Sequence, residues 1–224
     1  MRYDMGKERP RLDSRSPSPP TITGTLKGRK MGQQAFIIVD LQNDFCPGGS
    51  LAVPEGDRVI PVIQDWASRF QRQGKLVITT QDAHPADHIS FRERGGPWPP
   101  HCVTGTHGFE LHPDLHLLPH PAFHKGYLRD VDAYSGFEGT LVAPDGTLST
   151  PPVSLEEYLR RENVDTLHLA GLATDYCVRA TVLDALKLGF ATTVLVDGVR
   201  GVNVNPNDSE KALNEMAQSG AKVR

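Results

Sequence analysis

The chain alternates short, continuous apolar runs with segments in which apolar residues recur at helical spacing. Residues 36–39 (Phe-Ile-Ile-Val) form such a run and lead directly into Asp40. A short apolar run of this kind is typical of a strand that is buried on both faces. Residues 59–70 have helical spacing and are followed by Gly74, a residue type that commonly ends helices. This alternation constrains the fold more than any other feature of the sequence.

The same alternation continues along the rest of the chain. We predict further strands over residues 76–78, 122–124, 166–170 and 192–196, another beginning at residue 221, and helices over residues 154–163, 174–188 and 209–219. A capping box that runs from Ser154 to Glu157 opens the first of these helices. Strands that alternate with helices predict an α/β fold, a three-layer, doubly wound, mostly parallel sheet with helices on both faces.

Residues 1–30 differ in composition from the rest of the chain, because they are polar, rich in proline and nearly free of core residues. We predict a disordered N-terminal extension, with a targeting leader as the alternative. Residues 31–224 are then one domain, long enough to bury a core without disulfide staples.

Charge and cysteine content exclude several classes of protein. The net charge of −3 and the pI near 6.3 argue against a general nucleic-acid or anionic-membrane binder. The three cysteines, Cys46, Cys102 and Cys177, are an odd number without the spacing of a disulfide framework, which fits a reducing compartment. The apolar runs are shorter than a membrane span, and the N-terminus lacks the apolar region of a signal peptide. We therefore expect a soluble, cytoplasmic protein.

The segment Asp82-Ala83-His84, just after the apolar residues 76–78, contains candidate metal ligands. An aspartate and a histidine two positions apart at the exit of a strand point the same way and can hold one divalent cation. His88 follows shortly, and His101 lies in a rigid segment with two prolines before it. Carboxylate and imidazole ligands suit Zn²⁺, Fe²⁺ or Mn²⁺ rather than Ca²⁺ or Mg²⁺.

Four predicted strand ends carry compatible side chains: Asp40, Asp82 with His84, Lys125, and the turn that leads to Cys177. In open parallel sheets, ligands bind beyond the carboxyl ends of the strands, so we expect these side chains to form one site. Cys177 lies in the first turn of a predicted helix, where the helix dipole favours the thiolate and lowers the thiol pKa from about 8.5. Backbone N–H groups there can also bind an oxyanion, formed when the sulfur attacks a carbonyl.

Two other patterns carry weaker expectations. Histidines recur every four residues at His112, His116, His120 and His124, but prolines between them exclude a continuous helix, so we predict no shared metal site. Residues 197–201 follow the strand predicted over residues 192–196, and we predict a turn for them.

Six ordered blocks of the sequence resemble the isochorismatase-like cysteine hydrolase family, and within it the nicotinamidases (pyrazinamidases). The resembling region runs from about residue 35 to residue 223. The blocks are residues 39–51 (VDLQNDFCPGGSL), 82–85 (DAHP), 98–102 (WPPHC), 124–126 (HKG), 133–137 (AYSGF) and 171–178 (GLATDYCV).

This resemblance implies roles for individual residues. It implies a catalytic triad of Asp40, Lys125 and Cys177, and a metal held by Asp82, His84 and His101, with His88 as an optional further ligand. It also implies a cis peptide at Leu172-Ala173 and an oxyanion hole formed by the amides of Ala173 and Cys177. The residues implied to contact the substrate are Phe45, Trp98, Tyr134 and Leu172.

The implied reaction is the metal-dependent deamidation of nicotinamide to nicotinic acid and ammonia through a cysteine thioester, in NAD salvage, with pyrazinamide as a further substrate. One divalent metal ion is the implied cofactor, with zinc preferred and iron or manganese as alternatives. The nearest alternative is a sibling amidohydrolase acting on ureido or N-carbamoyl substrates; the candidate ligands Asp82, His84 and His101 favour the nicotinamidase. A metal-dependent small-molecule binder without turnover is an alternative from another class. We expect no nucleic-acid or membrane partner, and a homo-oligomer stays open.

Overall fold

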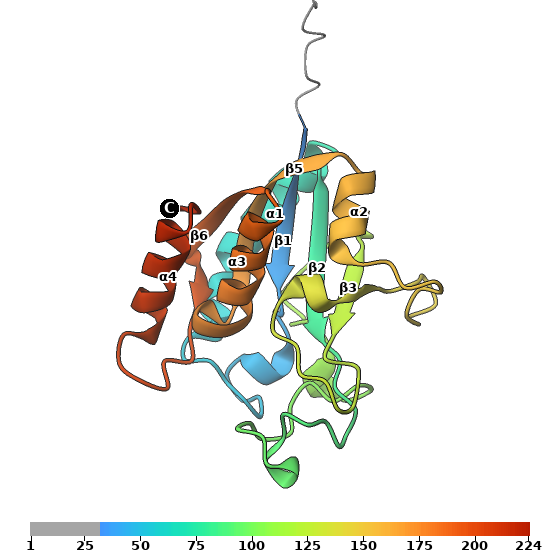
Figure 1. The fold of residues 1–224 in the computed structure, drawn as a ribbon, viewed down its shortest axis with the longest axis vertical. Helices are drawn as coiled ribbons and strands as arrows, with labels where there is room; N and C mark the ends of the chain where they lie inside the picture. The colour runs from blue at the N-terminus through green and yellow to red at the C-terminus, as the bar shows by residue number, and fades with distance from the viewer. Residues whose placement is uncertain (1–31) are drawn as a thin grey trace, which may run out of the picture. The chain divides into compact units, whose positions relative to one another are not determined.

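The computed structural model describes residues 32–224, so the predicted extension over residues 1–30 lies outside the described residues. Within them the strands form one sheet in the order β4-β3-β2-β1-β5-β6-β7 (Figure 1). All neighbouring strands are parallel except β3 and β4. The predicted mostly parallel sheet is therefore confirmed. The strands are β1 (Gln33–Val39), β2 (Leu76–Asp82), β3 (Ala122–Lys125), β4 (Thr140–Leu141), β5 (Val164–Leu172), β6 (Ala191–Arg200) and β7 (Lys222–Val223).

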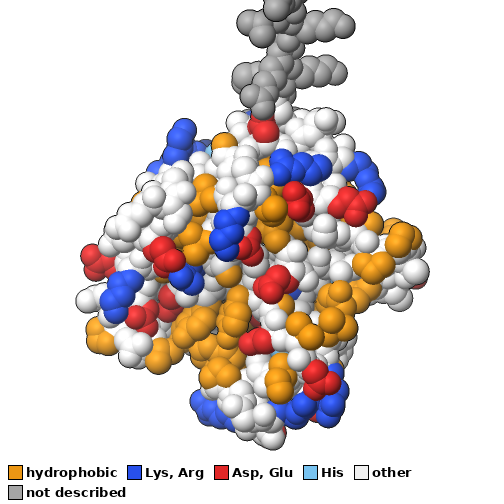
Figure 2. All heavy atoms as spheres, in the orientation of Figure 1, with side chains coloured by type: hydrophobic (Ala, Val, Ile, Leu, Met, Phe, Trp, Pro, Cys, Tyr) orange, Lys and Arg blue, Asp and Glu red, His pale blue; other side chains and the backbone are white. Residues whose placement is uncertain are grey.

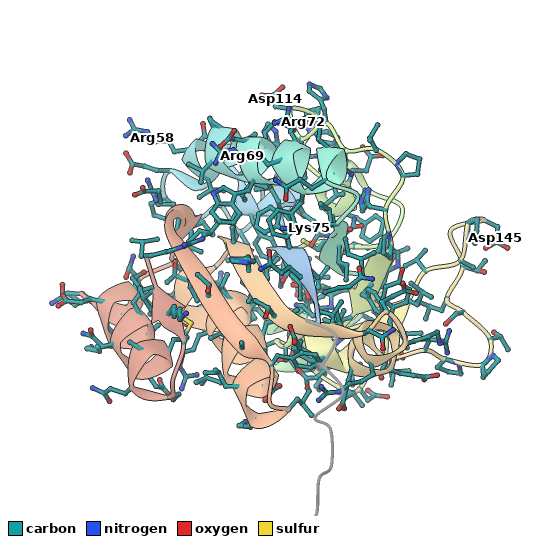
Figure 3. All side chains as sticks on the ribbon, turned by 90° about the horizontal axis from the view of Figure 1, so that it is seen from above. Arg58, Arg69, Arg72, Lys75, Asp114 and Asp145 are labelled. Carbon is teal, nitrogen blue, oxygen red and sulfur yellow. The ribbon has the colours of Figure 1, made fainter. Side chains whose placement is uncertain are left out.

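Helices cover both faces of the sheet. Helix α1 (Ile60–Arg72) lies on one face, whereas α2 (Leu155–Arg161), α3 (Arg179–Lys187) and α4 (Asp208–Gln218) lie on the other (Figures 1 and 3). Successive residues of β1 point to opposite faces, so Phe36 and Ile38 join the core under α1, and Ile37 joins the other core. The predicted three-layer, doubly wound fold is confirmed.

Among the described residues, no helix combines the length and apolar character that crossing a bilayer would require.

One local prediction is wrong, and one strand was not predicted. The turn predicted over residues 197–201 is wrong, because β6 continues to Arg200. A register shift between Leu169 and Gly171 on β5 lets β6 resume pairing at Val199, so the strand passes through Gly198 without ending. Strand β4 was not predicted, since two residues are too short to show a period.

The helix predicted over residues 174–188 begins differently from expectation. A π-helical turn, Thr174–Val178, precedes α3 and contains Cys177. One half of the predicted capping box of α2 is present, since the Ser154 hydroxyl accepts a hydrogen bond from the Glu157 amide (3.2 Å), whereas the Glu157 side chain makes no hydrogen bond back to the Ser154 amide.

The carboxyl ends of β1, β2 and β3 point to the same edge of the sheet, where the long connections after β2 and β3 gather (Figure 1). On the face drawn in Figure 2, acidic and basic side chains are interspersed, and hydrophobic side chains gather below its centre. The edge with the long connections is the place to look for the predicted site.

Candidate active site

Strand ends bring the predicted polar residues together. Asp40 directly follows β1, and Asp82 and Lys125 end β2 and β3, where they are paired in register. Cys177 lies in the π turn that follows β5. All four side chains are buried, and Asp40 and Lys125 have no exposed surface. The carboxyl edge of the sheet therefore holds these residues as one cluster, as predicted.

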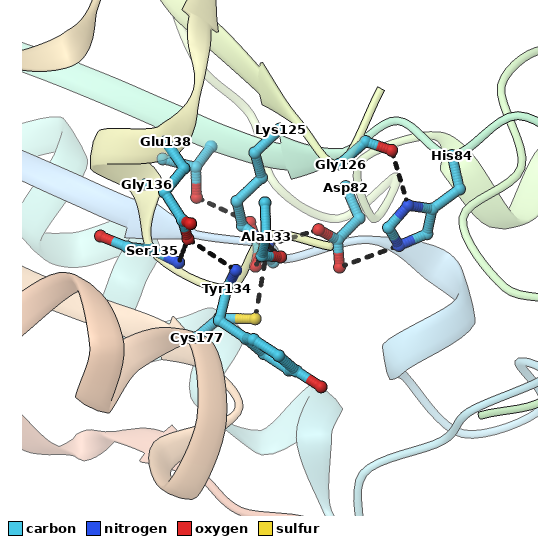
Figure 4. Close-up of polar contacts among 12 residues, drawn as sticks. Asp82, His84, Lys125, Gly126, Ala133, Tyr134, Ser135, Gly136, Glu138 and Cys177 are labelled. Atoms are coloured by element: carbon cyan, nitrogen blue, oxygen red, sulfur yellow. Dashed lines mark hydrogen bonds and ion pairs between the residues drawn. The ribbon is translucent and has the colours of Figure 1, made fainter. Parts of the chain in front are cut away.

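Lys125 is the centre of this cluster (Figure 4). Its ammonium contacts the Oδ1 atom of Asp82, and it lies 3.1 Å from Oδ2 of Asp40 and 3.4 Å from Sγ of Cys177. One cation thus joins two carboxylates to a thiol.

The two carboxylate oxygens of Asp40 differ in their hydrogen bonding. Its Oδ1 accepts a hydrogen bond from the Thr80 hydroxyl (2.7 Å), whereas Oδ2 has no hydrogen-bond partner among the described residues despite the nearby ammonium. Carboxylate oxygens of Asp40 and Asp82 and the Cys177 sulfur lie within 4.8 Å of one another. Oδ2 of Asp40 is suitably placed to exchange a proton with the Cys177 thiol.

Burial dominates the protonation of the acidic groups. It raises the pKa of Asp40 above its ordinary value, and the nearby Lys125 offsets only part of that rise. It also raises the pKa of Cys177 well above that of a free thiol, although Lys125 opposes it. The predicted lowering of the Cys177 pKa is therefore wrong for this structure. A thiol with a raised pKa needs a base to become a nucleophile.

Asp82, His84 and His101 form a group with the geometry of a metal site, since one donor atom from each lies within 4.8 Å of the others. His84 Nδ1 lies 2.9 Å from the Gly126 carbonyl and His101 Nδ1 lies 2.8 Å from the Pro99 carbonyl. With Nδ1–H donating to these carbonyls, the lone pair of each Nε2 is free.

The charge state of the two rings also fits a metal. Burial lowers the pKa of His84 to about 3 and lowers the pKa of His101, so both imidazoles are neutral near pH 7. Metal ligation needs neutral imidazole and an ionised carboxylate. The residues present therefore fit a divalent cation such as Zn²⁺.

His88 is not brought into this group. Its Nδ1 lies 2.7 Å from the Ser90 hydroxyl, and its Nε2 lies 3.0 Å from the Val131 carbonyl. Its ring stacks on His84 with centroids 4.1 Å apart. In this structure His88 supports the His84 ring, and both of its nitrogens have other partners.

A cavity lies between the Cys177 sulfur and the group formed by Asp82, His84 and His101, which we call the metal-binding group. Three of the residues predicted to contact substrate, Phe45, Trp98 and Tyr134, line it together with Asp82, His101, Ala173 and Cys177. Leu172 does not line it, because this side chain is fully buried in the core on the α1 side. The cavity is thus shared by the candidate nucleophile, two candidate metal ligands and several aromatic rings.

Sequence reasoning missed three further residues of the wall: Leu51, Tyr176 and Val202. Tyr176 packs edge-on against Trp98 (centroids 5.0 Å apart) and stacks on Tyr134 (5.9 Å). The Trp98 indole N–H donates to the Tyr134 hydroxyl (3.1 Å). The sequence contained one signal for these residues: Tyr176 is adjacent to Cys177. Val202 gave no such signal, because it follows residues 197–201, which were predicted to be a turn.

The peptide between Leu172 and Ala173 is cis, as predicted. The Ala173 carbonyl accepts hydrogen bonds from the Tyr176 and Val178 amides (3.1 Å each), which closes the π turn around Cys177. Ala173 and Cys177 both line the cavity, so their amides are candidates for an oxyanion hole.

The fold and this cluster are those expected of a cysteine hydrolase built on a doubly wound sheet, and the comparisons with known proteins agree. Residues 34–224 match the family model described as Isochorismatase domain. The chain therefore belongs to the isochorismatase family, which confirms the resemblance predicted from its motifs.

Individual relatives have names that are more specific than the family description. The chain is 44% identical over 207 residues to a nicotinamidase of Escherichia coli (strain K12), covering 85% of this chain and 94% of the relative. It is 42% identical over 194 residues to the nicotinamidase/pyrazinamidase of Mycobacterium tuberculosis, covering 85% and 97%. A crystal structure of the pyrazinamidase of Pyrococcus horikoshii in complex with zinc matches with a TM-score of 0.73 and 45% identity, covering 86% of this chain and 98% of that chain.

Proposed function

We propose that this protein is a metal-dependent amidohydrolase that converts nicotinamide to nicotinic acid and ammonia through a thioester on Cys177, as a step of NAD salvage, and that it also accepts pyrazinamide. One observation carries the proposal: the Lys125 ammonium contacts both Cys177 and Asp82, so nucleophile and metal-binding group border one cavity. The substrate is inferred from the relatives, which are described as nicotinamidase and pyrazinamidase.

Asp82, His84 and His101 would hold the metal, with zinc preferred and iron or manganese as alternatives. Zinc is supported by the zinc complex of the Pyrococcus horikoshii relative. When bound, the ion supplies a Lewis acid that orients the pyridine nitrogen of the substrate.

The first half of the reaction forms the thioester. The substrate ring lies between Phe45 and Trp98, which places the carboxamide near Cys177. Asp40 accepts the thiol proton, and Lys125 stabilises the thiolate while the sulfur attacks the carboxamide carbon. The oxyanion accepts hydrogen bonds from the Ala173 and Cys177 amides. The carbon–nitrogen bond then breaks, and Asp40 returns its proton to the departing ammonia.

The second half hydrolyses the thioester. Asp40, again ionised, takes a proton from water, and the hydroxide attacks the thioester carbon. The carbon–sulfur bond breaks, nicotinic acid leaves, and the sulfur regains the proton from Asp40. The raised pKa of the buried Asp40 suits this role, because an ordinary aspartic acid is too strong an acid to hold the proton between steps. We place the reaction in the cytoplasm, where a reducing environment keeps the Cys177 thiol free.

Ammonia release from nicotinamide, measured together with the zinc content of the same sample, tests the proposal. We expect the wild type to release ammonia and Cys177→Ala to lose at least about a thousandfold in kcat while it keeps its zinc, since a nucleophile is removed and the ligands are not. Comparable turnover by Cys177→Ala would refute the nucleophile assignment. Hydrolysis of a ureido or N-carbamoyl substrate but not of nicotinamide would identify the protein as the sibling amidohydrolase.

A further inference from the structure

The hydrogen-bond ladder between β1 and β2 stops before it reaches Asp82. The two strands pair from Ala35 and Leu76 up to Val39 and Thr80, and the last ladder bond runs from the Asp40 amide to the Thr80 carbonyl (3.1 Å). Asp40 then takes a left-handed conformation (φ +47°), and the chain leaves the sheet. Residues two apart on a strand direct their backbone groups to the same neighbour, so the Asp82 amide and carbonyl face the place that β1 has vacated.

The Gln42 side chain fills that place. Its Oε1 accepts a hydrogen bond from the Asp82 amide (2.8 Å), and its Nε2 donates to the Asp82 carbonyl (2.8 Å). A carboxamide offers the same donor and acceptor as a peptide group, so the side chain continues the ladder where the strand has ended. Nε2 also donates to the Phe109 carbonyl (2.8 Å), and the Gln42 residue has no exposed surface.

The position of Asp82 matters because its two carboxylate oxygens have different neighbours. Its Oδ1 contacts the Lys125 ammonium, and its Oδ2 lies 3.8 Å from Nε2 of His84, on the side of the metal-binding group. A small rotation of the Asp82 peptide would move both oxygens. Ligand geometry of a metal site tolerates errors of only about 0.2 Å.

We propose that Gln42 is a positioning residue, which acts through the Asp82 peptide to hold the carboxylate at the metal-binding group and at Lys125 simultaneously. This inference rests on the metal-dependent function proposed above and deepens it. Gln42 touches neither the cavity nor the metal-binding donor atoms, so its effect on the metal is transmitted through the Asp82 backbone.

If Gln42 had a purely structural role, its replacement would lower stability without changing Zn²⁺ affinity. The chain contains a second glutamine that serves as a control for this case. Gln64 on α1 makes the same two-point clamp on His116: its Oε1 accepts from the His116 amide (2.7 Å) and its Nε2 donates to the His116 carbonyl (2.9 Å). Neither Gln64 nor His116 lines the cavity. Replacing either glutamine by methionine removes the same pair of hydrogen bonds and keeps side-chain length.

The experiment compares Gln42→Met and Gln64→Met in the full chain. The apparent Kd for Zn²⁺ is measured on metal-free protein, without substrate, by competition with a chromophoric chelator, and Tm is measured in parallel. We expect Gln42→Met to lose more stability than Gln64→Met, because the Asp82 groups that it leaves unpaired are buried whereas those of His116 are exposed. Only Gln42→Met should also bind Zn²⁺ at least about tenfold more weakly, the usual effect of losing a support behind a ligand.

Zn²⁺ affinities that agree within about twofold between the two variants would overturn the proposal. If Gln42→Met does not fold, Gln42→Asn keeps the carboxamide but is too short to bridge both groups of Asp82, and the same loss of Zn²⁺ affinity is expected. Because the readout needs no substrate, it separates the two ideas. A Gln42→Met defect in zinc binding, with no nicotinamide turnover by the wild type, would retain the positioning role and reject the proposed reaction.

Discussion

Gly126 is where a single added methyl group should damage the metal-binding group. This glycine follows β3 with φ of +61°, and its carbonyl lies 2.9 Å from Nδ1 of His84. A Cβ at this position would lie 2.5 Å from Cε1 and 2.7 Å from Nδ1 of the His84 ring. Carbon atoms in contact are normally about 3.5–4.0 Å apart, so the ring of Gly126→Ala must move by roughly 1 Å.

The cost has two parts that a second glycine can separate. A left-handed alanine costs about 1–2 kcal/mol of unfolding free energy, and disrupting the buried bond from His84 to Gly126 adds about 1–3 kcal/mol. Gly74, after α1, has nearly the same φ (+65°), but a Cβ there meets no atom within 4 Å. Gly74→Ala should therefore show the backbone cost alone.

Denaturant unfolding of the metal-free proteins and Zn²⁺ competition measure both parts. We expect Gly126→Ala to be less stable than Gly74→Ala by about 1–3 kcal/mol and to bind Zn²⁺ at least about tenfold more weakly, since Nε2 of His84 moves with the ring. If the two alanine variants bind Zn²⁺ equally well, His84 is not held by Gly126 in the way described here.

Two further predictions concern the cavity wall and the core. Asp175 accepts hydrogen bonds from the amides of Val202 (3.0 Å) and Asn203 (2.7 Å), so Asp175→Asn should loosen the wall at Val202 and raise KM for nicotinamide about threefold to tenfold in steady-state kinetics. Asp208→Asn, which alters a similar bond to an amide elsewhere, should not change KM. Burial lowers the pKa of His168 from 6.5 to about 4, so the unfolded chain binds more protons between these values and stability falls as the pH drops through that range. Between pH 7 and pH 5 the wild type should lose about 2 kcal/mol more than His168→Phe in denaturant unfolding, and parallel pH profiles would contradict this.

Much of the site could be predicted because the ends of the strands are marked in the sequence by apolar runs that lead into polar residues. Apolar runs lead into Asp40 and Lys125, and a parallel sheet brings such ends to one edge whatever the loops do. The strand predicted over residues 76–78 extends to Asp82, which places Asp82 in register with Lys125. Position at a strand end was therefore a reliable signal.

Contacts that depend on register or on long connections were beyond prediction. The clamp of Gln42 on Asp82 exists only because β1 leaves the sheet two residues earlier than β2. Val202 reaches the cavity because β6 passes through a register shift that no periodicity reveals. The pKa of Cys177 was misjudged for a related reason. Sequence shows the helix start that favours a thiolate, but not the burial that raises the pKa of the thiol.

Lys125 explains why the proposed nucleophile, base and metal ligands have to be considered together. A buried ammonium is stable only when it is paired, and Asp40 and Asp82 outweigh its burial and hold the pKa of Lys125 well above its ordinary value. Burial and the carboxylates of Asp40 and Asp82 raise the pKa of the Cys177 thiol, and Lys125 opposes them. In the proposed mechanism, a cation held by Asp82 would offset part of this negative charge. Under the proposed function, metal occupancy and the reactivity of Cys177 are therefore coupled through a single carboxylate, the one that we propose Gln42 positions.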